Sequence, residues 1–171
     1  MNLLKKLFQK FLGLFITKPQ EGKVGFNVSL SAKVKYADGR IVDKGVICRK
    51  CVTDDFVEFL VDKLVAAGNI NLFKYHDAGI GTTAEDETDS GLETPWGGAR
   101  VSGTQVEGAS ANIYKSVATI EFTSAKAITE HGLLSQATGG ILADRSVFSV
   151  INVDTNVSIE FTYELTVNSG G

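Results

Sequence analysis

Two long stretches of this sequence alternate apolar residues with polar or small ones, and they constrain the fold more than any other feature. The first stretch has an apolar residue at every second position from Val24 to Tyr36, and the second has one from Val157 to Val167. Successive side chains of a β-strand point to opposite faces, so a period of two places all these apolar side chains on one face of a strand. We therefore predict two long strands, each with one buried face.

The segments between these two stretches predict further strands. Asp38-Gly39 is a favoured tight-turn dipeptide, so the first long strand is expected to return as a hairpin over residues 23–51. Turn residues divide the rest of the chain into further strands, expected at residues 71–76, 99–106, 113–123, 126–134, 141–151 and 157–167. The chain has eighteen glycines against two prolines, which suits strands joined by glycine turns.

One helix interrupts this series of strands. Thr53 or Asp54 is a suitable N-cap, and Gly68 stands where a helix commonly ends. Between them a broad apolar stripe is formed by Phe56, Val57, Leu60, Val61, Leu64 and Val65. We predict a mainly β fold, a jelly-roll-like antiparallel β-sandwich with one inserted helix.

The N-terminal segment has a different pattern, that of a basic amphipathic helix. Residues 1–16 place large apolar side chains on one helix face, with Lys5, Lys6 and Lys10 largely opposite. The apolar side chains expected to bind a partner are Leu4, Leu7, Phe8, Phe11, Leu12 and Phe15. Pro19 and Gly22 then break the helical pattern. We expect a helical arm and hinge over residues 1–22 and a sandwich domain over residues 23–171.

The arm has the features of neither a secretion signal nor a membrane span. Lysines interrupt its apolar run, no A-x-A cleavage motif follows, and no eighteen consecutive apolar residues occur in the sequence. The apolar face can therefore lie in a membrane interface or dock in a groove of a protein partner or sister subunit. The chain has a net charge of −3 and its first 18 residues carry four lysines and no acid, so the body is acidic. Together with the lack of a lipidation signal, this favours a protein partner.

Charge and cysteine content exclude two further classes of protein. Phosphate backbones demand a cationic surface, so the net negative charge argues against nucleic acid as the main partner. Cys48 and Cys51 are the two cysteines, too few for the disulfide framework of a small secreted domain, and we expect assembly in a reducing compartment. Their C-x-x-C spacing is half a zinc site, but His76 and His131 lie on separate expected strands and share no ligand-pair spacing. We expect no zinc.

The stretch from residue 77 to 93 contains six acidic residues and no basic residue, and we expect a solvated anionic loop. Residues 79–83 (GIGTT) superficially resemble a phosphate cradle, but the lysine of a P-loop is missing, so a shaped turn is the better interpretation. Asp86, Asp89 and Glu93 do not match the spacing of an EF-hand. The sequence therefore predicts no metal and no cofactor here.

Acid, base and cation side chains also occur as neighbouring pairs, Glu130-His131 and Asp144-Arg145. Alternation along a strand sends the two members of each pair to opposite faces. The sequence contains no G-x-S-x-G or comparable nucleophile signature. We therefore expect no catalytic residues, and assign these four side chains to ion pairing and hydrogen bonding within or between subunits.

Several segments of the body resemble a pattern found in bacteriophage virion proteins. Residues 75–85 (YHDAGIGTTAE) and 89–95 (DSGLETP) match H-D-x-G-x-G-T-T-A followed by D-x-x-L-x-T-P. Further matching segments follow in the same order at residues 127–134, 139–148 and 159–163. The resemblance covers residues 24–171, and the arm lies outside it. It implies a small phage structural protein of the head-decoration (cement) or tail-fibre type, with a β-sandwich fold and trimeric or dimeric assembly.

Composition and resemblance together predict a virion structural protein that decorates and cements the capsid through its body and its arm. The expected partners are the major capsid protein, or another virion protein, together with further copies of the chain itself. We expect the chain to assemble in the host cytoplasm and to lie on the capsid surface of the virion. One alternative is a tail baseplate or fibre adaptor. Another is a peripheral membrane protein whose arm lysines lie on anionic lipid. An enzyme would need a pocket that brings His76 or His131 to a carboxylate.

Overall fold

The two alternating stretches form neighbouring strands at the centre of one sheet. The computed structural model describes residues 25–49, 52–65 and 72–168, without the side chains of residues 63–65. Strand β1 (Gly25–Lys35) pairs antiparallel along its whole length with strand β9 (Val157–Asn168). Their alternate side chains are buried in the core, among them Val28, Leu30, Val34, Val157, Ile159, Phe161 and Tyr163. Both predicted strands are confirmed, and the predicted arm lies outside the described residues.

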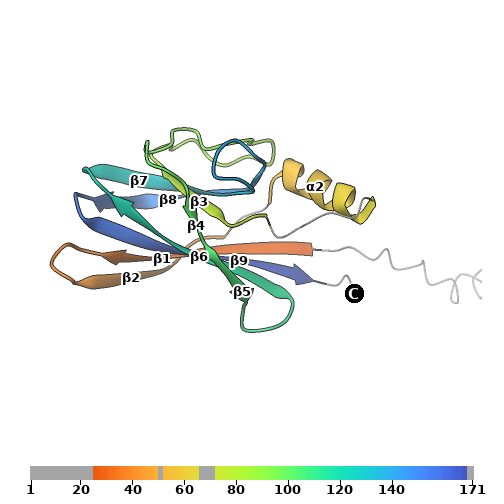
Figure 1. Cartoon of the computed structure of the whole chain (residues 1–171), viewed down its shortest axis with the longest axis horizontal. Coiled ribbons are helices and arrows are strands. Elements are labelled where there is room, and N and C mark those ends of the chain that lie inside the picture. Colours follow the sequence, from red (N-terminus) through yellow and green to blue (C-terminus); the bar gives the residue numbers. More distant parts are fainter. Residues whose placement is uncertain (1–24, 50–51, 66–71, 169–171) are drawn as a thin grey trace, which may run out of the picture.

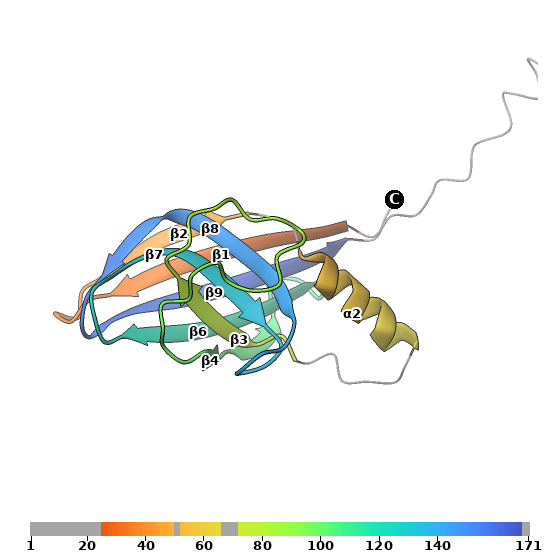
Figure 2. The same cartoon turned by 90° about the horizontal axis from the view of Figure 1, so that it is seen from above.

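Within the described residues the chain forms two antiparallel sheets (Figures 1 and 2). The other strands are β2 (Ile41–Cys48), β3 (Tyr75–Gly79), β4 (Val101–Ser102), β5 (Thr104–Glu107), β6 (Ile113–Phe122), β7 (Lys126–Leu134) and β8 (Leu142–Val153). The five-stranded sheet has the order β2-β1-β9-β6-β5, and the four-stranded sheet has the order β4-β3-β7-β8. The prediction of a mainly β, antiparallel fold is confirmed.

The two sheets share one apolar core. Phe122 and Ile159 of the larger sheet and Ile128 and Leu133 of the smaller sheet are almost fully buried in it. No helix in the described ranges is both long enough and apolar enough to span a bilayer.

The predicted helix is present as α2 (Asp54–Val65) and covers one end of the sheets (Figure 2). Thr53 is its N-cap, because the amide of Phe56 donates to the Thr53 hydroxyl at 3.3 Å. Phe56 and Phe59 face inward and pack edge-to-face on Phe73, each with ring centroids 4.9 Å apart. The end predicted at Gly68 lies outside the described residues. The start of β1 and the end of β9 lie at the α2 end of the molecule (Figures 1 and 2).

Two strand predictions need correction. The strand expected at residues 71–76 begins four residues later and is found at Tyr75–Gly79. The strand expected at residues 99–106 is divided at Gly103, so that β4 pairs with β3 in one sheet and β5 with β6 in the other. A Cβ atom at Gly103 would lie 2.6 Å from the Ser116 hydroxyl and 2.8 Å from His76 Nε2. A glycine is therefore required where the chain changes sheets, and its lack of a side chain permits the close approach.

Candidate functional site

The partner-binding residues predicted on the arm, Leu4, Leu7, Phe8, Phe11, Leu12 and Phe15, lie outside the described residues, as does Cys51. Cys48 is buried at the end of β2, with its sulfur 3.8 Å from a carboxylate oxygen of Glu85. Three other groups of side chains in the described residues could serve a function: a buried ion pair under the loop after β3, a polar chain between the sheets, and an apolar cavity beside α2.

The first group is centred on Glu130 of β7, whose carboxylate is completely buried beneath the loop after β3. Its Oε1 accepts hydrogen bonds from the amides of Gly81, at 3.0 Å, and Thr94, at 2.8 Å. Its Oε2 accepts from the amide of Glu93, at 3.1 Å, and from Arg145 Nε, at 2.7 Å. Four donors satisfy this buried charge, so the carboxylate can hold the loop against the sheet.

Arg145 of β8 completes the attachment of the loop. Its side chain is only 3% exposed. Besides Glu130, its guanidinium donates to Asp89 at 3.0 Å, to Glu93 at 3.2 Å and to the carbonyl of Thr83 at 3.1 Å. Burial lowers the pKa of Arg145, but the hydrogen bonds and charges of Glu130 and Asp89 outweigh this effect and raise it. We call Glu130 and Arg145 the loop clamp.

The loop clamp explains the glycine pattern of this segment. A Cβ atom at Gly79 would lie 2.4 Å from Glu130 Oε1, and one at Gly81 would lie 2.6 Å from the same oxygen. Both distances are shorter than any van der Waals contact, so only glycine lets the loop close over the carboxylate. The GIGTT segment runs from the last residue of β3 into the irregular loop, and it lies against the carboxylate of Glu130.

The expectation of a freely solvated acidic loop is wrong for part of this segment. Asp89 and Glu93 pair with Arg145, and the hydroxyl and amide of Thr83 donate to the Glu93 carboxylate at 2.7 and 2.8 Å. These hydrogen bonds lower the pKa of Glu93. Asp86 does remain exposed. In the described part of the chain, no group of three or more His, Cys, Asp and Glu side chains is arranged to hold a metal ion.

A second ion pair anchors the far side of the same loop. Arg100 Nε lies 3.3 Å from Asp77 Oδ2, and its Nη1 donates to the carbonyls of Gln136, at 3.0 Å, and Gly139, at 2.6 Å. Burial raises the pKa of Asp77, and the hydrogen bond from the Ala78 amide and the pairing with Arg100 oppose that shift. The loop is thus attached to β3, to the clamp and to the β7–β8 turn.

The second group is a chain of hydrogen bonds between the sheets. His76 Nδ1 lies 2.9 Å from His131 Nε2, and His76 Nε2 lies 2.8 Å from the Ser116 hydroxyl. All three side chains are fully buried. Burial lowers the pKa of His76 to about 4, and burial together with His76 lowers the pKa of His131 well below its usual value. Both rings are therefore neutral at pH 7, when each can donate one hydrogen bond and accept another.

His76 and His131 lie on separate strands, as predicted, but the sequence does not indicate that these strands are neighbours. Strands β3 and β7 are neighbours, and Ala78 stands opposite His131, so His76 is its diagonal neighbour across the pair. The prediction that Glu130 and His131 face opposite sides is confirmed, because the His131 ring packs on Phe161 of the other sheet, with centroids 4.7 Å apart. The serine–histidine–histidine order has the elements of a nucleophilic site, and all three side chains are completely buried.

Asp144 and Tyr163 are two further polar side chains buried in this interior. Asp144 accepts a hydrogen bond from the Ser146 hydroxyl at 2.8 Å, and its second oxygen has no partner among the described residues. Burial raises the pKa of Asp144 to about 7. The charge of Glu85 also raises this pKa, whereas the hydrogen bond from Ser146 lowers it. The Tyr163 hydroxyl also has no described partner, and burial and Asp144 raise its pKa well above the usual value.

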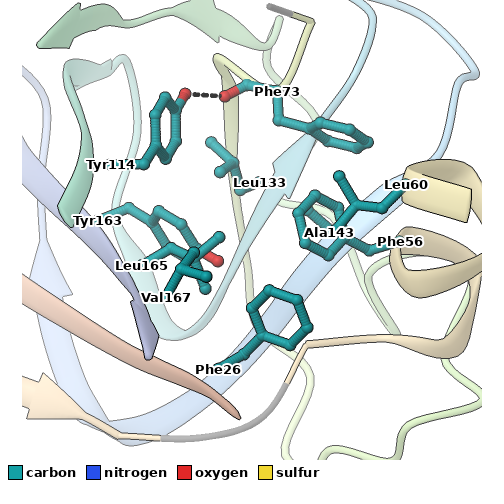
Figure 3. Close-up of a pocket in the computed structure, with 10 residues that line it drawn as sticks. All are labelled: Phe26, Phe56, Leu60, Phe73, Tyr114, Leu133, Ala143, Tyr163, Leu165 and Val167. Carbon is teal, nitrogen blue, oxygen red and sulfur yellow. Dashed lines mark hydrogen bonds between the residues drawn. The ribbon is translucent and has the colours of Figure 1, made fainter. Parts of the chain in front are cut away.

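The third group is an apolar cavity of about 180 Å³ beside α2, shown in Figure 3. Five aromatic and five aliphatic residues line it: Phe26, Phe56, Leu60, Phe73, Tyr114, Leu133, Ala143, Tyr163, Leu165 and Val167. The Tyr114 hydroxyl donates to the carbonyl of Phe73 at one side (Figure 3). No pattern in the sequence indicates this cavity, because alternation marks a buried face without showing how completely the side chains fill it.

Comparison of the chain with protein-family models, with curated proteins and with solved structures found no match in any of the three. The loop clamp can hold a surface loop in one shape, the polar chain can hold the two sheets in register, and the cavity can take an apolar group. The first of these bears most directly on function, because it shapes a solvent-facing segment.

Proposed function

We propose that the chain is a structural protein of a bacteriophage virion that decorates and cements the capsid. One observation carries this proposal: the sequence segments that resemble phage virion proteins converge on the loop clamp. Residues 75–85 and 89–95 supply the loop and its backbone donors, residues 127–134 supply Glu130, and residues 139–148 supply Arg145. The shared pattern therefore encodes a loop of fixed shape, which is suited to binding another protein surface.

A fixed loop is useful in an assembly protein because the conformational entropy of the loop is lost on folding, before the partner binds. Side chains and loops that are ordered on binding reduce the free energy of association. Here the donors of Gly81, Glu93 and Thr94 already occupy the Glu130 carboxylate. Ile80 lies on the loop and is 39% exposed, so it is available for such a contact.

We further propose that the body is a jelly-roll-like β-sandwich that assembles as a dimer or trimer. The chain passes from one sheet to the other after β2, β4, β6 and β8, which supports a jelly-roll-like sandwich of two sheets. Strands β2 and β8 are edge strands, and they carry exposed apolar side chains: Ile41 is 63% exposed, Val46 is 46% exposed and Val150 is 52% exposed. Exposed apolar residues on edge strands favour contacts between copies.

The arrangement of the chemical groups favours assembly over catalysis. The histidine–serine chain is closed to solvent, and Glu130 and Arg145 satisfy each other and the loop. In an active site, by contrast, a substrate must reach the nucleophile and the base. This supports the structural role, with the arm reaching across to neighbouring capsid subunits.

Deletion of residues 1–18 tests the proposal. We expect heads assembled with the truncated chain to lose it on purification, while circular dichroism shows that the body remains folded. A matched control replaces Lys5, Lys6 and Lys10 with glutamine and leaves the apolar stripe intact. It should stay on the heads, because the apolar side chains provide the anchor. Retention of the truncated chain at full occupancy would refute the proposal.

The copy number per particle, measured by quantitative mass spectrometry, separates the possible locations. A number comparable to that of the capsid subunits supports decoration. A few copies would place the chain in the tail, as a baseplate or fibre adaptor. Absence from particles, combined with salt-sensitive binding to anionic vesicles, would instead indicate a peripheral membrane protein.

A further inference from the structure

The cavity beside α2 has the size and chemistry to accept one large apolar side chain. Its volume is about 180 Å³, and a cavity of about 150 Å³ in another protein holds a benzene molecule. Phe26, Phe73 and Leu165 form part of its wall, and Leu60 of α2 is only partly buried beside it. Val167 also lines it, although this residue is 39% exposed, unlike the buried apolar residues at alternate positions earlier in β9. The exposure of Val167 indicates that the cavity opens to solvent.

The arm joins the body next to this cavity. Phe26, the second residue of β1, lines the cavity and packs against Phe56 of α2, with ring centroids 6.3 Å apart. Only residues 16–24 separate Phe15, the last apolar residue of the arm's stripe, from β1. Nine residues reach at most about 30 Å, which is enough to return to the cavity. A short tether also gives the arm a millimolar effective concentration there, which favours the arm of the same chain over that of another copy.

The charge of α2 complements the charge of the arm. The helix carries four acidic residues against one lysine, and its carboxylates at Asp54, Asp55, Glu58 and Asp62 are exposed. At about 100° per residue, Val57 and Val61 lie between Leu60 at the cavity and the carboxylates of Asp54 and Glu58. Val57 is 41% exposed and Val61 is 54% exposed. An apolar strip bordered by acids matches a helix whose apolar stripe is bordered by lysines.

We propose that the arm docks on its own chain, with its apolar stripe over Val57, Val61 and the cavity, and with one of its phenylalanines, Phe8, Phe11 or Phe15, inserted between the sheets. Lys5, Lys6 and Lys10 then face the carboxylates of α2. This inference rests on the cavity and on the sequence of the arm, and it does not depend on the virion role. In that role, the docked arm would be a stored state that the capsid partner replaces.

Photo-crosslinking within the full-length chain tests the docking. The photoreactive residue p-benzoylphenylalanine replaces Phe11, and this chain is mixed at low concentration with an isotopically heavy chain that lacks the probe. We expect crosslinks to residues 56–60, Phe73 or Val167, and only within the light chain. The matched control places the probe at Gln9, on the polar face of the arm, and should give several-fold fewer crosslinks to those positions.

Each other outcome contradicts the proposal in a recognisable way. Crosslinks to the heavy chain would make a second copy the occupant. Crosslinks elsewhere on the body, or none, would leave the cavity without the arm, and a lipid retained in the cavity in native mass spectrometry would identify a different occupant. A charge reversal in α2, Glu58→Lys, should reduce the crosslink yield at low salt, whereas the reversal Glu121→Lys, at an exposed position of β6, should not. Equal yields from both variants would contradict the role of the α2 carboxylates.

Discussion

Replacement of Arg145 by methionine is the most informative perturbation of the loop clamp. Methionine retains an unbranched apolar side chain of comparable length but removes the guanidinium. The carboxylate of Glu130, which is completely buried, then loses its 2.7 Å ion pair and keeps only the amide donors of Gly81, Glu93 and Thr94. The variant therefore leaves a buried negative charge without a compensating cation.

The magnitude follows from the burial of the two partners. Removing one partner of a buried ion pair costs about 3–5 kcal/mol in the free energy of unfolding, because the remaining charge stays desolvated. The three backbone donors that remain on Glu130 place the expected loss near the lower end, at about 3 kcal/mol. The pairing of Arg145 with Asp89 and Glu93 adds little, since these carboxylates are 25% and 38% exposed.

Urea unfolding monitored by Trp96 fluorescence measures this loss. Trp96 is the single tryptophan of the chain, and it stands at the end of the clamped loop with its ring on Phe122, centroids 4.9 Å apart. With a slope of about 2 kcal/mol per molar urea, a loss of about 3 kcal/mol lowers the midpoint by roughly 1.5 M. The fluorescence also reports whether the loop has left the sheet before the body unfolds.

Arg40→Met provides the matched control. Arg40 lies on the β1–β2 hairpin with its side chain 57% exposed, beside Asp38 and over the ring of Tyr36. Its replacement should change the free energy of unfolding by less than about 1 kcal/mol. If Arg145→Met unfolds within 1 kcal/mol of the wild type, or no lower than Arg40→Met, the buried pair does not hold the loop and the reasoning is refuted.

Two further predictions test the same structure. Gly81→Ala should lower the free energy of unfolding by about 1–3 kcal/mol, because its Cβ atom would lie 2.6 Å from Glu130 Oε1. Gly91→Ala, where a Cβ atom would have no neighbour within 4 Å, should be nearly neutral. Equal effects of the two substitutions in urea unfolding would contradict the steric argument. The second prediction concerns pH. The pKa of Asp144 is raised to about 7, so between pH 4 and 7 the folded chain holds a proton that the unfolded chain has lost, and stability falls as the pH rises through this window. The pKa of His76 is lowered to about 4, so between about pH 4 and 6.5 the unfolded chain binds a proton that the folded chain does not, and stability rises with pH. The lowered pKa of the other buried histidine acts in the same sense. Asp144→Asn removes the contribution of the Asp144 carboxyl, which opposes that of the histidines. Between pH 4.5 and 6 the free energy of unfolding of the variant should therefore rise with pH more steeply than that of the wild type, by about 1.4 kcal/mol per pH unit. Equal slopes for the two proteins would show that the carboxyl group of Asp144 does not hold its proton.

Alternation and turn residues were sufficient to predict most of the strands. The strand predicted at residues 126–134 is found with the same limits, Lys126–Leu134, because both its turns are marked in the sequence. The strand predicted at residues 99–106 shows where such prediction stops. Its pattern continues through Gly103, although the chain changes sheets there. Gly103 is needed at this point because Ser116 and His76, which belong to other strands, lie close to its backbone. Local periodicity carries no information on such tertiary contacts.

The candidate site was predictable only in part, for the same reason. Ion pairing was the expected role for Glu130 and Arg145, and the structure confirms that they pair. Their meeting depends on the register of β7 and β8, in which Gly132 stands opposite Arg145 and Glu130 opposite Val147. Sequence alone does not specify that register, since it includes irregularities on either side of the pair.

Immunogold labelling of purified phage particles shows whether the chain decorates the capsid. The antibody is raised against residues 23–171, so that it recognises the body whether or not the arm is engaged. The proposal predicts label distributed over the whole surface of the head. Label confined to the tail, or particles without label, would contradict it.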